Sequence, residues 1–275
     1  MVSLAIIHTN PGHDISYVLH AVSRSTVLPH EVIVLSTLKR RDCYNVHGLN
    51  IRSVQVAWLG RSKATRSTAI GEALKQSKHS QLIVIDGSCV PHATCIERML
   101  TCMDNCSGLV TCSPRVLMQS IKDRSYSRLL ENQSEEHPHI TAVETDCEQT
   151  LSVQFSDMCF GVRRGLNTCV IPYPSDYDTS VIASQAFAQL YIQADLPIVQ
   201  CPARVYHNQE SNNWTTEDVV KLVADSNYFF EKYDIWPQPR LLHELSIAQR
   251  LDWHPLQSKP ITLMATQEWV ATTGT

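Results

Sequence analysis

The sequence lacks several short motifs that mark common enzyme classes. It contains no Gly-x-Gly-x-x-Gly or Gly-x-x-x-x-Gly-Lys phosphate loop, no Gly-x-Ser-x-Gly nucleophile elbow and no His-Glu-x-x-His metal motif. A dinucleotide or triphosphate site of the usual kind needs one of the glycine-rich loops, and an α/β-hydrolase needs the elbow. These absences argue against Rossmann dehydrogenases, P-loop nucleotide hydrolases and α/β-hydrolases.

Charged residues are also scarce, at 18% of the 275 residues, and the formal net charge is −4. A nucleic-acid-binding surface is normally basic, so we expect no nucleic-acid partner. No apolar run reaches the roughly 18–20 residues that span a bilayer. The apolar stretch from Met1 to Ile7 lacks a basic region before it and a cleavage site after it. We therefore expect a buried strand there, no transmembrane segment, and a cytoplasmic protein, free or peripheral at the inner face of a membrane.

Cysteine, by contrast, is abundant, although no Cys-x-x-Cys pair occurs and zinc-site spacing is missing. Without an export signal, reduced and mostly buried thiols are expected. The ten cysteines are Cys43, Cys89, Cys95, Cys102, Cys106, Cys112, Cys147, Cys159, Cys169 and Cys201.

Apolar runs alternate with segments of helical periodicity, and this alternation predicts an α/β fold with a mostly parallel central sheet flanked by helices. Hydrophobic residues make up 43% of the chain, enough for a sizeable core. The expected strands are residues 2–7, 31–35, 51–58, 82–85, 109–112, 152–162 and 197–205. The expected helices are residues 14–25, 67–76, 95–103, 182–193, 215–233 and 241–249. Residues 119–148 are polar and aperiodic, which indicates a surface excursion, here interpreted as an acceptor-side flap.

Polar residues follow several of the expected strands, and ligands of open α/β sheets bind beyond the carboxyl ends of parallel strands. We therefore expect one nucleotide-binding cleft at these ends. The residues concerned are His8, Thr9 and Asn10 after the first strand, Ser36 after the second, Asp86, Gly87 and Ser88 after the fourth, and His207 after the late strand.

Asp86 is the strongest metal-ligand candidate, because hard cations such as Mg²⁺ and Mn²⁺ prefer carboxylate oxygens and also bind diphosphates. An Asp that caps the following helix is the structural alternative. His207 could be a second ligand, or a hydrogen-bonded histidine at a strand end. Lys63 and Arg66, before the helix at residues 67–76, could hold a diphosphate, or they could be a solvated helix start.

The order of these segments resembles family 2-type glycosyltransferases of the GT-A fold, over roughly residues 2–255, with a bacterial galactosyltransferase-like subgroup as the nearest likeness. The fourth strand and its exit look like the family's strand that ends in the Asp-x-Asp metal motif. The similar segments are Ala5–Asn10, Leu28–Val34, Lys63–Ser67, Leu82–Pro91, Phe160–Arg164, Ala194–Gln209 and Tyr233–Pro237. The resemblance implies one GT-A domain at residues 1–255, with a nucleotide-sugar half at 1–115, an acceptor half at 116–255, and a C-terminal tail at 256–275.

The acidic motifs of that family are degenerate in this chain. Asp86-Gly87-Ser88 lacks the second acid of Asp-x-Asp, and Ser36 stands where an acid normally contacts the nucleoside. The segment that supplies the general base aligns with Ala183-Ser184-Gln185-Ala186 and has no acid. An acceptor hydroxyl needs such a base. The nearest acids are the candidate replacements: Asp157, Asp176 and Asp178.

The resemblance implies transfer of a sugar from a nucleotide-diphosphate donor to an acceptor hydroxyl on a glycan, a lipid-linked molecule or a small molecule. Mn²⁺ or Mg²⁺ is expected to be weakly held at Asp86 and His207, or absent. The alternative is a catalytically degenerate protein of the same fold that binds or scaffolds a protein partner.

Overall fold

The computed structural model describes residues 1–12, 14–38, 44–56, 65–118, 128–138, 140–144, 147–163, 171–208 and 214–264. By internal contacts the chain divides into two compact units. Unit 1 comprises Met1–Ser175 with Ala183–Ser211, and unit 2 comprises Asp176–Ile182 with Asn212–Thr275.

Unit 1 is built around a ten-stranded sheet of the described residues, with strand order β3-β2-β1-β4-β9-β6-β10-β5 and with β7 on β6 and β8 on β10. The strands β3, β2, β1 and β4 pair in parallel, as do β6 and β10, whereas β9 runs antiparallel to both neighbours. The strands are β1 Val2–His8, β2 Glu31–Ser36, β3 Ile51–Gln55, β4 Gln81–Asp86, β5 Cys89–Pro91, β6 Leu109–Leu117, β7 Ser134–Glu136, β8 Glu148–Gln149, β9 Cys159–Arg163 and β10 Ile198–Asn208.

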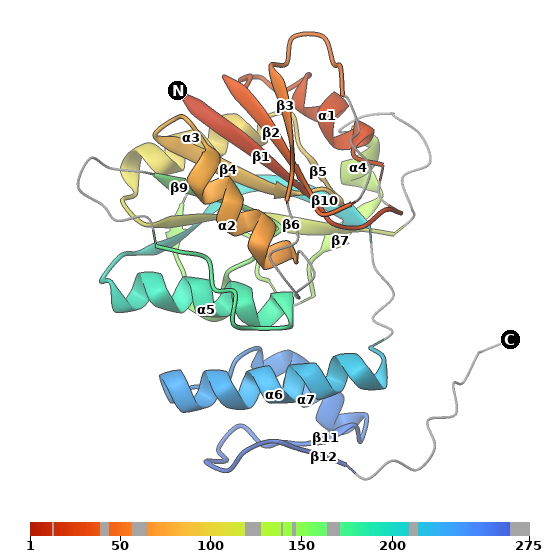
Figure 1. Ribbon diagram of the computed structural model, residues 1–275, viewed down its shortest axis with the longest axis vertical. Helices are drawn as coiled ribbons and strands as arrows, with labels where there is room; N and C mark the ends of the chain where they lie inside the picture. Colours follow the sequence, from red (N-terminus) through yellow and green to blue (C-terminus); the bar gives the residue numbers. More distant parts are fainter. Residues whose placement is uncertain are drawn as a thin grey trace, which may run out of the picture. The chain divides into compact units, whose positions relative to one another are not determined.

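Helices cover both faces of this sheet. α1 (Ser16–Val22) and α3 (Cys95–Asn105) share one apolar cluster with alternate strand residues such as Leu4, Ile6 and Ile83. α2 (Arg66–Gln76) contacts β1, β2 and β4, and Figure 1 shows it lying in front of these strands. Because strands covered on both faces lose their polar alternation, β1 and β4 read as continuous apolar runs in the sequence.

The predicted elements up to residue 112 are confirmed in type, with bounds that move by a few residues. β6 is longer than expected and ends at Leu117. The expected strand at residues 51–58 ends at Gln55, and its last two positions lie outside the described residues. The surface excursion at residues 119–148 contains α4 (Arg128–Asn132), β7 and the start of β8, while 119–127 are not among the described residues.

The expected strand at residues 152–162 is wrong in its first half. A short 3-10 helix occupies Ser152–Gln154, a turn follows, and only Cys159–Arg163 forms β9. The turn is stabilised by Thr111 of β6, whose Oγ1 donates to the carbonyl of Ser156 at 3.0 Å and accepts from its N–H at 3.3 Å. Backbone groups that pair with a side chain cannot join a strand ladder, and local periodicity does not show such a partner.

Unit 2 contains α6 (Thr216–Tyr233), α7 (Pro239–Ile247) and a hairpin of β11 (Leu251–Asp252) and β12 (Thr262–Leu263). α6 begins at the predicted position, with a capping box in which Thr215 and Asp218 bond each other's backbone N–H groups. Trp236 stacks on Phe230 with ring centroids 4.0 Å apart. Part of the expected C-terminal tail packs in this unit, because Ile261 is buried and its backbone pairs with the Asn227 side chain: the Ile261 N–H donates to Oδ1 at 2.7 Å, and Nδ2 donates to the Ile261 carbonyl at 3.0 Å.

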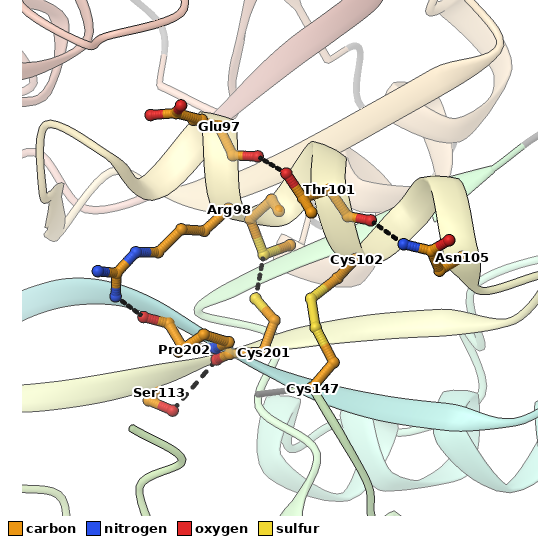
Figure 2. Close-up of a disulfide and its surroundings, with 10 residues drawn as sticks. Glu97, Arg98, Thr101, Cys102, Asn105, Ser113, Cys147, Cys201 and Pro202 are labelled. Atoms are coloured by element: carbon orange, nitrogen blue, oxygen red, sulfur yellow. Dashed lines mark hydrogen bonds between the residues drawn. A yellow bond between two sulfur atoms is a disulfide. The ribbon is translucent and has the colours of Figure 1, made fainter. Parts of the chain in front are cut away.

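The cysteines divide into two groups. Six are free and buried as predicted, namely Cys89, Cys95, Cys106, Cys112, Cys159 and Cys201. Cys102 of α3 and the exposed Cys147 instead form a disulfide, with Cα atoms 6.4 Å apart and a sequence separation of 45 (Figure 2). The expectation of reduced thiols is therefore wrong for this pair. Cys43 and Cys169 lie outside the described residues.

Candidate active site at the strand ends

The parallel strands β1, β2 and β4 end together at one edge of the sheet. His8 is paired in register with Ser36, and Ile7 with Asp86. Backbone hydrogen bonds continue past the strand ends, from the N–H of Thr37 to the carbonyl of His8 at 3.2 Å and from that of Gly87 to the carbonyl of Ile7 at 2.8 Å. The predicted polar strand ends are thus neighbours in space.

The pleat of the strands divides these side chains between two faces. Side chains alternate along a strand, and paired residues of parallel neighbours point the same way. His8 and Ser36 follow the α1 side, where Leu4, Ile6, Val32 and Val34 share one cluster. Asp86 follows the opposite side, that of α2. A molecule bound beyond this edge would therefore meet His8 and Ser36 on one side and Asp86 on the other.

Gly87 allows the turn after β4 to lie close to the end of β1. A Cβ atom at this position would lie 2.9 Å from the carbonyl oxygen of Ile7 and 3.1 Å from Cγ2 of Ile15. The first distance is too short for a real contact, and the atom met is backbone, which cannot move aside easily. Glycine at this position is explained by that close approach.

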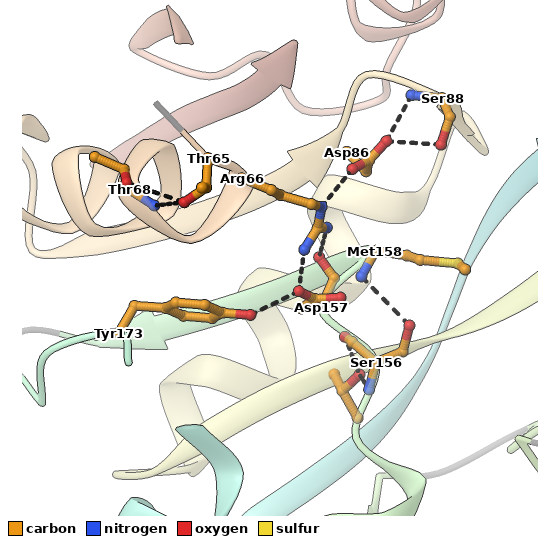
Figure 3. A network of polar contacts seen from close by, with 10 residues as sticks. Thr65, Arg66, Thr68, Asp86, Ser88, Ser156, Asp157, Met158 and Tyr173 are labelled. Carbon is orange, nitrogen blue, oxygen red and sulfur yellow. Dashed lines mark hydrogen bonds and ion pairs between the residues drawn. The ribbon is translucent and has the colours of Figure 1, made fainter. Parts of the chain in front are cut away.

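Arg66, the first residue of α2, joins Asp86 and Asp157 in one network (Figure 3). Its Nε donates to Oδ2 of Asp86 at 2.8 Å, and its Nη1 forms an ion pair with Oδ2 of Asp157. Its Nη2 donates to the carbonyl oxygen of Asp157 at 2.9 Å. One guanidinium thus holds together the start of α2, the end of β4 and the turn before β9.

The other oxygen of Asp86 accepts from Ser88. The backbone N–H and the hydroxyl of Ser88 donate to Oδ1 of Asp86 at 2.8 and 2.6 Å. Burial would raise the pKa of Asp86, but Arg66 and these hydrogen bonds hold it below its usual value. Burial would likewise lower the pKa of Arg66, and Asp157 and Asp86 instead raise it far above its usual value. Both groups are therefore charged at neutral pH.

Asp157 is fixed from a third direction by Tyr173. The Tyr173 hydroxyl donates to Oδ2 of Asp157 at 2.8 Å, and its ring packs on Phe187 of α5 (Ser180–Gln193) with centroids 4.9 Å apart. Burial, together with the nearby Asp157 carboxylate, raises the pKa of Tyr173 well above its usual value. Oδ2 of Asp157 is therefore engaged twice. Sequence reasoning missed Tyr173, since no local pattern marks it.

His207 is placed beside this edge by strand pairing. It lies opposite Cys89 in the antiparallel pair of β10 with β5. Cys89 follows Asp86 by three positions in the sequence. Its ring lies against that of His137, with centroids 5.5 Å apart. Of the other predicted residues, Thr9 is half-buried, Asn10 accepts from the N–H of Gly12 at 2.9 Å, and Lys63 lies outside the described residues.

Asp176 and Asp178 belong to unit 2. Asp176 is 45% exposed, lies 3.7 Å from Nζ of Lys232 and accepts from the Tyr228 hydroxyl at 3.1 Å. Asp178 is exposed. In the aligned segment that lacks acids, Ser184 and Gln185 are buried within α5.

The described residues do not fit a resident divalent cation at Asp86. Such ions take several oxygen ligands, preferably carboxylates. Ser88 supplies a hydroxyl and an N–H where a second carboxylate would be needed, and both point at Asp86. Across the described parts of the chain, no group of three or more His, Cys, Asp or Glu residues is placed to hold a metal ion.

Comparison with known proteins gives matches to solved structures only. No protein-family profile and no curated protein matches the sequence. TarS 1–349 of S. aureus superposes with a TM-score of 0.51 at 14% identity, covering 83% of this chain and 64% of TarS 1–349. The same protein in complex with UDP gives 0.51 at 13% identity, covering 90% and 71%. GalNAc-T7 with UDP, GalNAc and Mn²⁺ gives 0.52 at 11% identity, covering 90% and 56%.

These neighbours are GT-A-type glycosyltransferases, and this chain has their fold: an α/β architecture with a central sheet flanked by helices. The predicted fold class is confirmed. At such low identity the likeness shows the fold alone, and this chain spans 64% of the TarS fragment. Among the described residues, no helix is both long and apolar enough to cross a bilayer.

Proposed function

We propose that the chain binds a nucleotide-diphosphate sugar at the carboxyl ends of β1, β2 and β4 and transfers the sugar to an acceptor hydroxyl. The observation that carries this proposal is the shared strand edge, where His8 pairs with Ser36 and Ile7 with Asp86, in a chain with the GT-A fold. Open α/β sheets bind their ligands at such an edge. UDP is present in the TarS and GalNAc-T7 structures that resemble this chain, which supports a nucleotide donor.

The proposed donor site consists of the residues at this edge. Hydroxyl and imidazole groups on the α1 side and the Asp86 carboxylate on the α2 side can hydrogen-bond a nucleoside. The set is His8, Thr9, Asn10, Ser36, Arg66, Asp86, Gly87 and Ser88, together with Lys63. The sequence predicts that Mn²⁺ or Mg²⁺ is held weakly at Asp86 and His207, or is absent, and this stays a prediction.

The general base is proposed among Asp157, Asp176 and Asp178. Asp157 is the least available of the three, because Arg66 and Tyr173 both occupy its Oδ2. Asp176 and Asp178 are exposed and can meet an acceptor. We expect Asp176→Asn or Asp178→Asn to reduce transfer by about 10²-fold or more, the usual contribution of a positioned base.

The alternative proposal is a protein that binds the nucleotide, or a protein partner, without transfer. It is favoured by the closed Arg66 network and by the missing acids at Ser184 and Gln185. The two proposals differ in whether the sugar is released or transferred. The glycosyltransferase binds the nucleotide sugar and transfers or releases the sugar. The binding protein does neither, and it binds the nucleotide only if it recognises its partner in the nucleotide-bound state.

A thermal-shift titration with UDP, GDP and their sugars, with and without Mn²⁺, tests the proposal. A ligand at 100 times its dissociation constant stabilises the folded state by about 2.7 kcal/mol. For a chain of this size we expect an increase in Tm of several degrees. No shift with any nucleotide would contradict donor binding. A shift without sugar hydrolysis or transfer would favour the binding protein.

The compartment is also part of the proposal. The sequence favours the cytoplasm or the inner face of a membrane, whereas the Cys102–Cys147 disulfide favours an oxidising compartment, because cytosolic thiols are mostly kept reduced. Alkylation of the free thiols in freshly lysed cells, followed by mass spectrometry, separates the two. An unmodified Cys147 that becomes reactive after reduction supports the disulfide, and an alkylated Cys147 supports the cytoplasm.

A further inference from the structure

Asp86 is engaged at three of the roughly four acceptor positions that a carboxylate offers. The N–H and the hydroxyl of Ser88 occupy Oδ1, and Nε of Arg66 occupies one position on Oδ2. A divalent cation that used Asp86 as a ligand would have to displace Arg66 or Ser88. Displacing Arg66 from Asp86 would cost a guanidinium that is only 16% exposed one of its two carboxylate partners.

The local charge also disfavours a second cation. Arg66 keeps its positive charge at any pH that the fold tolerates. Its guanidinium lies in contact with both carboxylates that could bind a metal at this edge. A divalent ion on Asp86 would stand within a few ångströms of that charge, in surroundings where water screens little.

We infer that Arg66 occupies the place of the metal ion at this strand end, so that the chain binds its donor without Mn²⁺ or Mg²⁺. Asp86 then serves as a hydrogen-bond acceptor held in position by Arg66 and Ser88. Because this inference rests on the proposed function, its test also includes an arm that contains no nucleotide.

The consequence most open to measurement is a gain of metal binding. Replacing Arg66 by glutamine removes the positive charge and the guanidinium contacts to Oδ2 of both carboxylates, while the Tyr173 hydroxyl still donates to Oδ2 of Asp157. In the natural chain the two carboxylates lie close enough to share one guanidinium. Two neighbouring carboxylates supply oxygen ligands of the kind that Mn²⁺ prefers. The variant Arg66→Gln should therefore bind Mn²⁺ where the natural chain does not.

The experiment first titrates the chain with Mn²⁺ alone, and the electron paramagnetic resonance signal of the ion reports binding. It then titrates the chain with UDP in a buffer that contains either EDTA or Mn²⁺. For the natural chain we expect no saturable Mn²⁺ binding below about 1 mM, and a UDP dissociation constant that changes by less than about twofold between the two buffers. For Arg66→Gln we expect Mn²⁺ affinity to rise by about tenfold or more. The matched control is Arg52→Gln, which removes a guanidinium near the buried Glu31 and should leave Mn²⁺ binding unchanged.

A second variant covers the case in which Arg66→Gln does not fold. Ser88→Asp keeps Arg66 and adds a carboxylate beside Asp86 in a half-buried turn. Because Arg66 still pairs with both Asp86 and Asp157, this variant should show no saturable Mn²⁺ binding below about 1 mM, and a gain of Mn²⁺ binding would contradict the exclusion of the ion by Arg66. Saturable Mn²⁺ binding by the natural chain, or UDP binding that requires Mn²⁺, would overturn the inference. If UDP binds in neither buffer, the proposed function fails, and the Mn²⁺ arm still decides whether Arg66 excludes the ion.

Discussion

Two clusters in this chain combine a cation, a carboxylate and a tyrosine, and they differ in burial. In unit 1, Arg66 is shared by Asp86 and Asp157, and all three side chains are at most 16% exposed. In unit 2, Lys232 lies 3.7 Å from Asp176, and these side chains are 40% and 45% exposed. The first cluster ties three elements together, and the second lies on a solvated surface. Burial, rather than the identity of the residues, decides what each cluster contributes.

The largest expected effect is that of Arg66→Gln. Removing one partner of a buried ion pair leaves uncompensated charge and costs about 3–5 kcal/mol. We expect the free energy of unfolding, measured by urea denaturation at neutral pH, to fall by about that amount. A loss below about 1 kcal/mol would mean that water reaches the cluster as freely as it reaches Lys232.

Gly87→Ala should have the second largest effect. The added Cβ would lie 2.9 Å from the Ile7 carbonyl oxygen, so β1 and the turn after β4 must separate. Overpacking of this kind costs about 1–3 kcal/mol. Urea denaturation measures the loss, and Gly71→Ala in α2, where nothing lies within 4 Å of the new atom, is the matched control. The control should be neutral or stabilising.

Acid should destabilise the natural chain more than a variant that lacks the Asp86 carboxylate. The folded-state pKa of Asp86 lies below its usual value of 3.8. As the pH falls, the unfolded chain therefore takes up this proton first, and stability is lost as the pH drops from about 5 through the folded pKa. We expect the natural chain to lose more of its free energy of unfolding than Asp86→Asn between about pH 5 and pH 3. Equal slopes would show that Arg66 does not hold the ionised form.

The smallest effect is expected for Lys232→Gln in unit 2. Exposed ion pairs contribute about 0–1 kcal/mol, and salt screens them further. The free energy of unfolding should therefore change by less than about 1 kcal/mol, even though Lys232 contacts Asp176 as Arg66 contacts Asp86. A loss as large as that of Arg66→Gln would remove the distinction between the two clusters.

Local patterns predicted the ends of β1, β2 and β4 because apolar runs of this length stop where polar residues begin. The start of α6, next to Thr215, was predictable in the same way. The partners of Arg66 were not, since Asp86 and Asp157 lie 20 and 91 positions away along the chain. The same holds for the Cys102–Cys147 disulfide, whose separation of 45 carries no periodic signal. The Arg66–Asp157 pair depends on β9 lying beside β4, which only the assembled sheet provides.

A crystal structure of the chain soaked with UDP and Mn²⁺ tests the central claim most directly, because it shows nucleotide and ion together. The account predicts UDP density beyond the ends of β1, β2 and β4, near His8, Ser36 and Asp86, with Arg66 still paired to Asp86 and no Mn²⁺ on its carboxylate. UDP bound elsewhere, or no UDP at all, would contradict the proposed site. Mn²⁺ on Asp86 with Arg66 displaced would contradict the role inferred for Arg66.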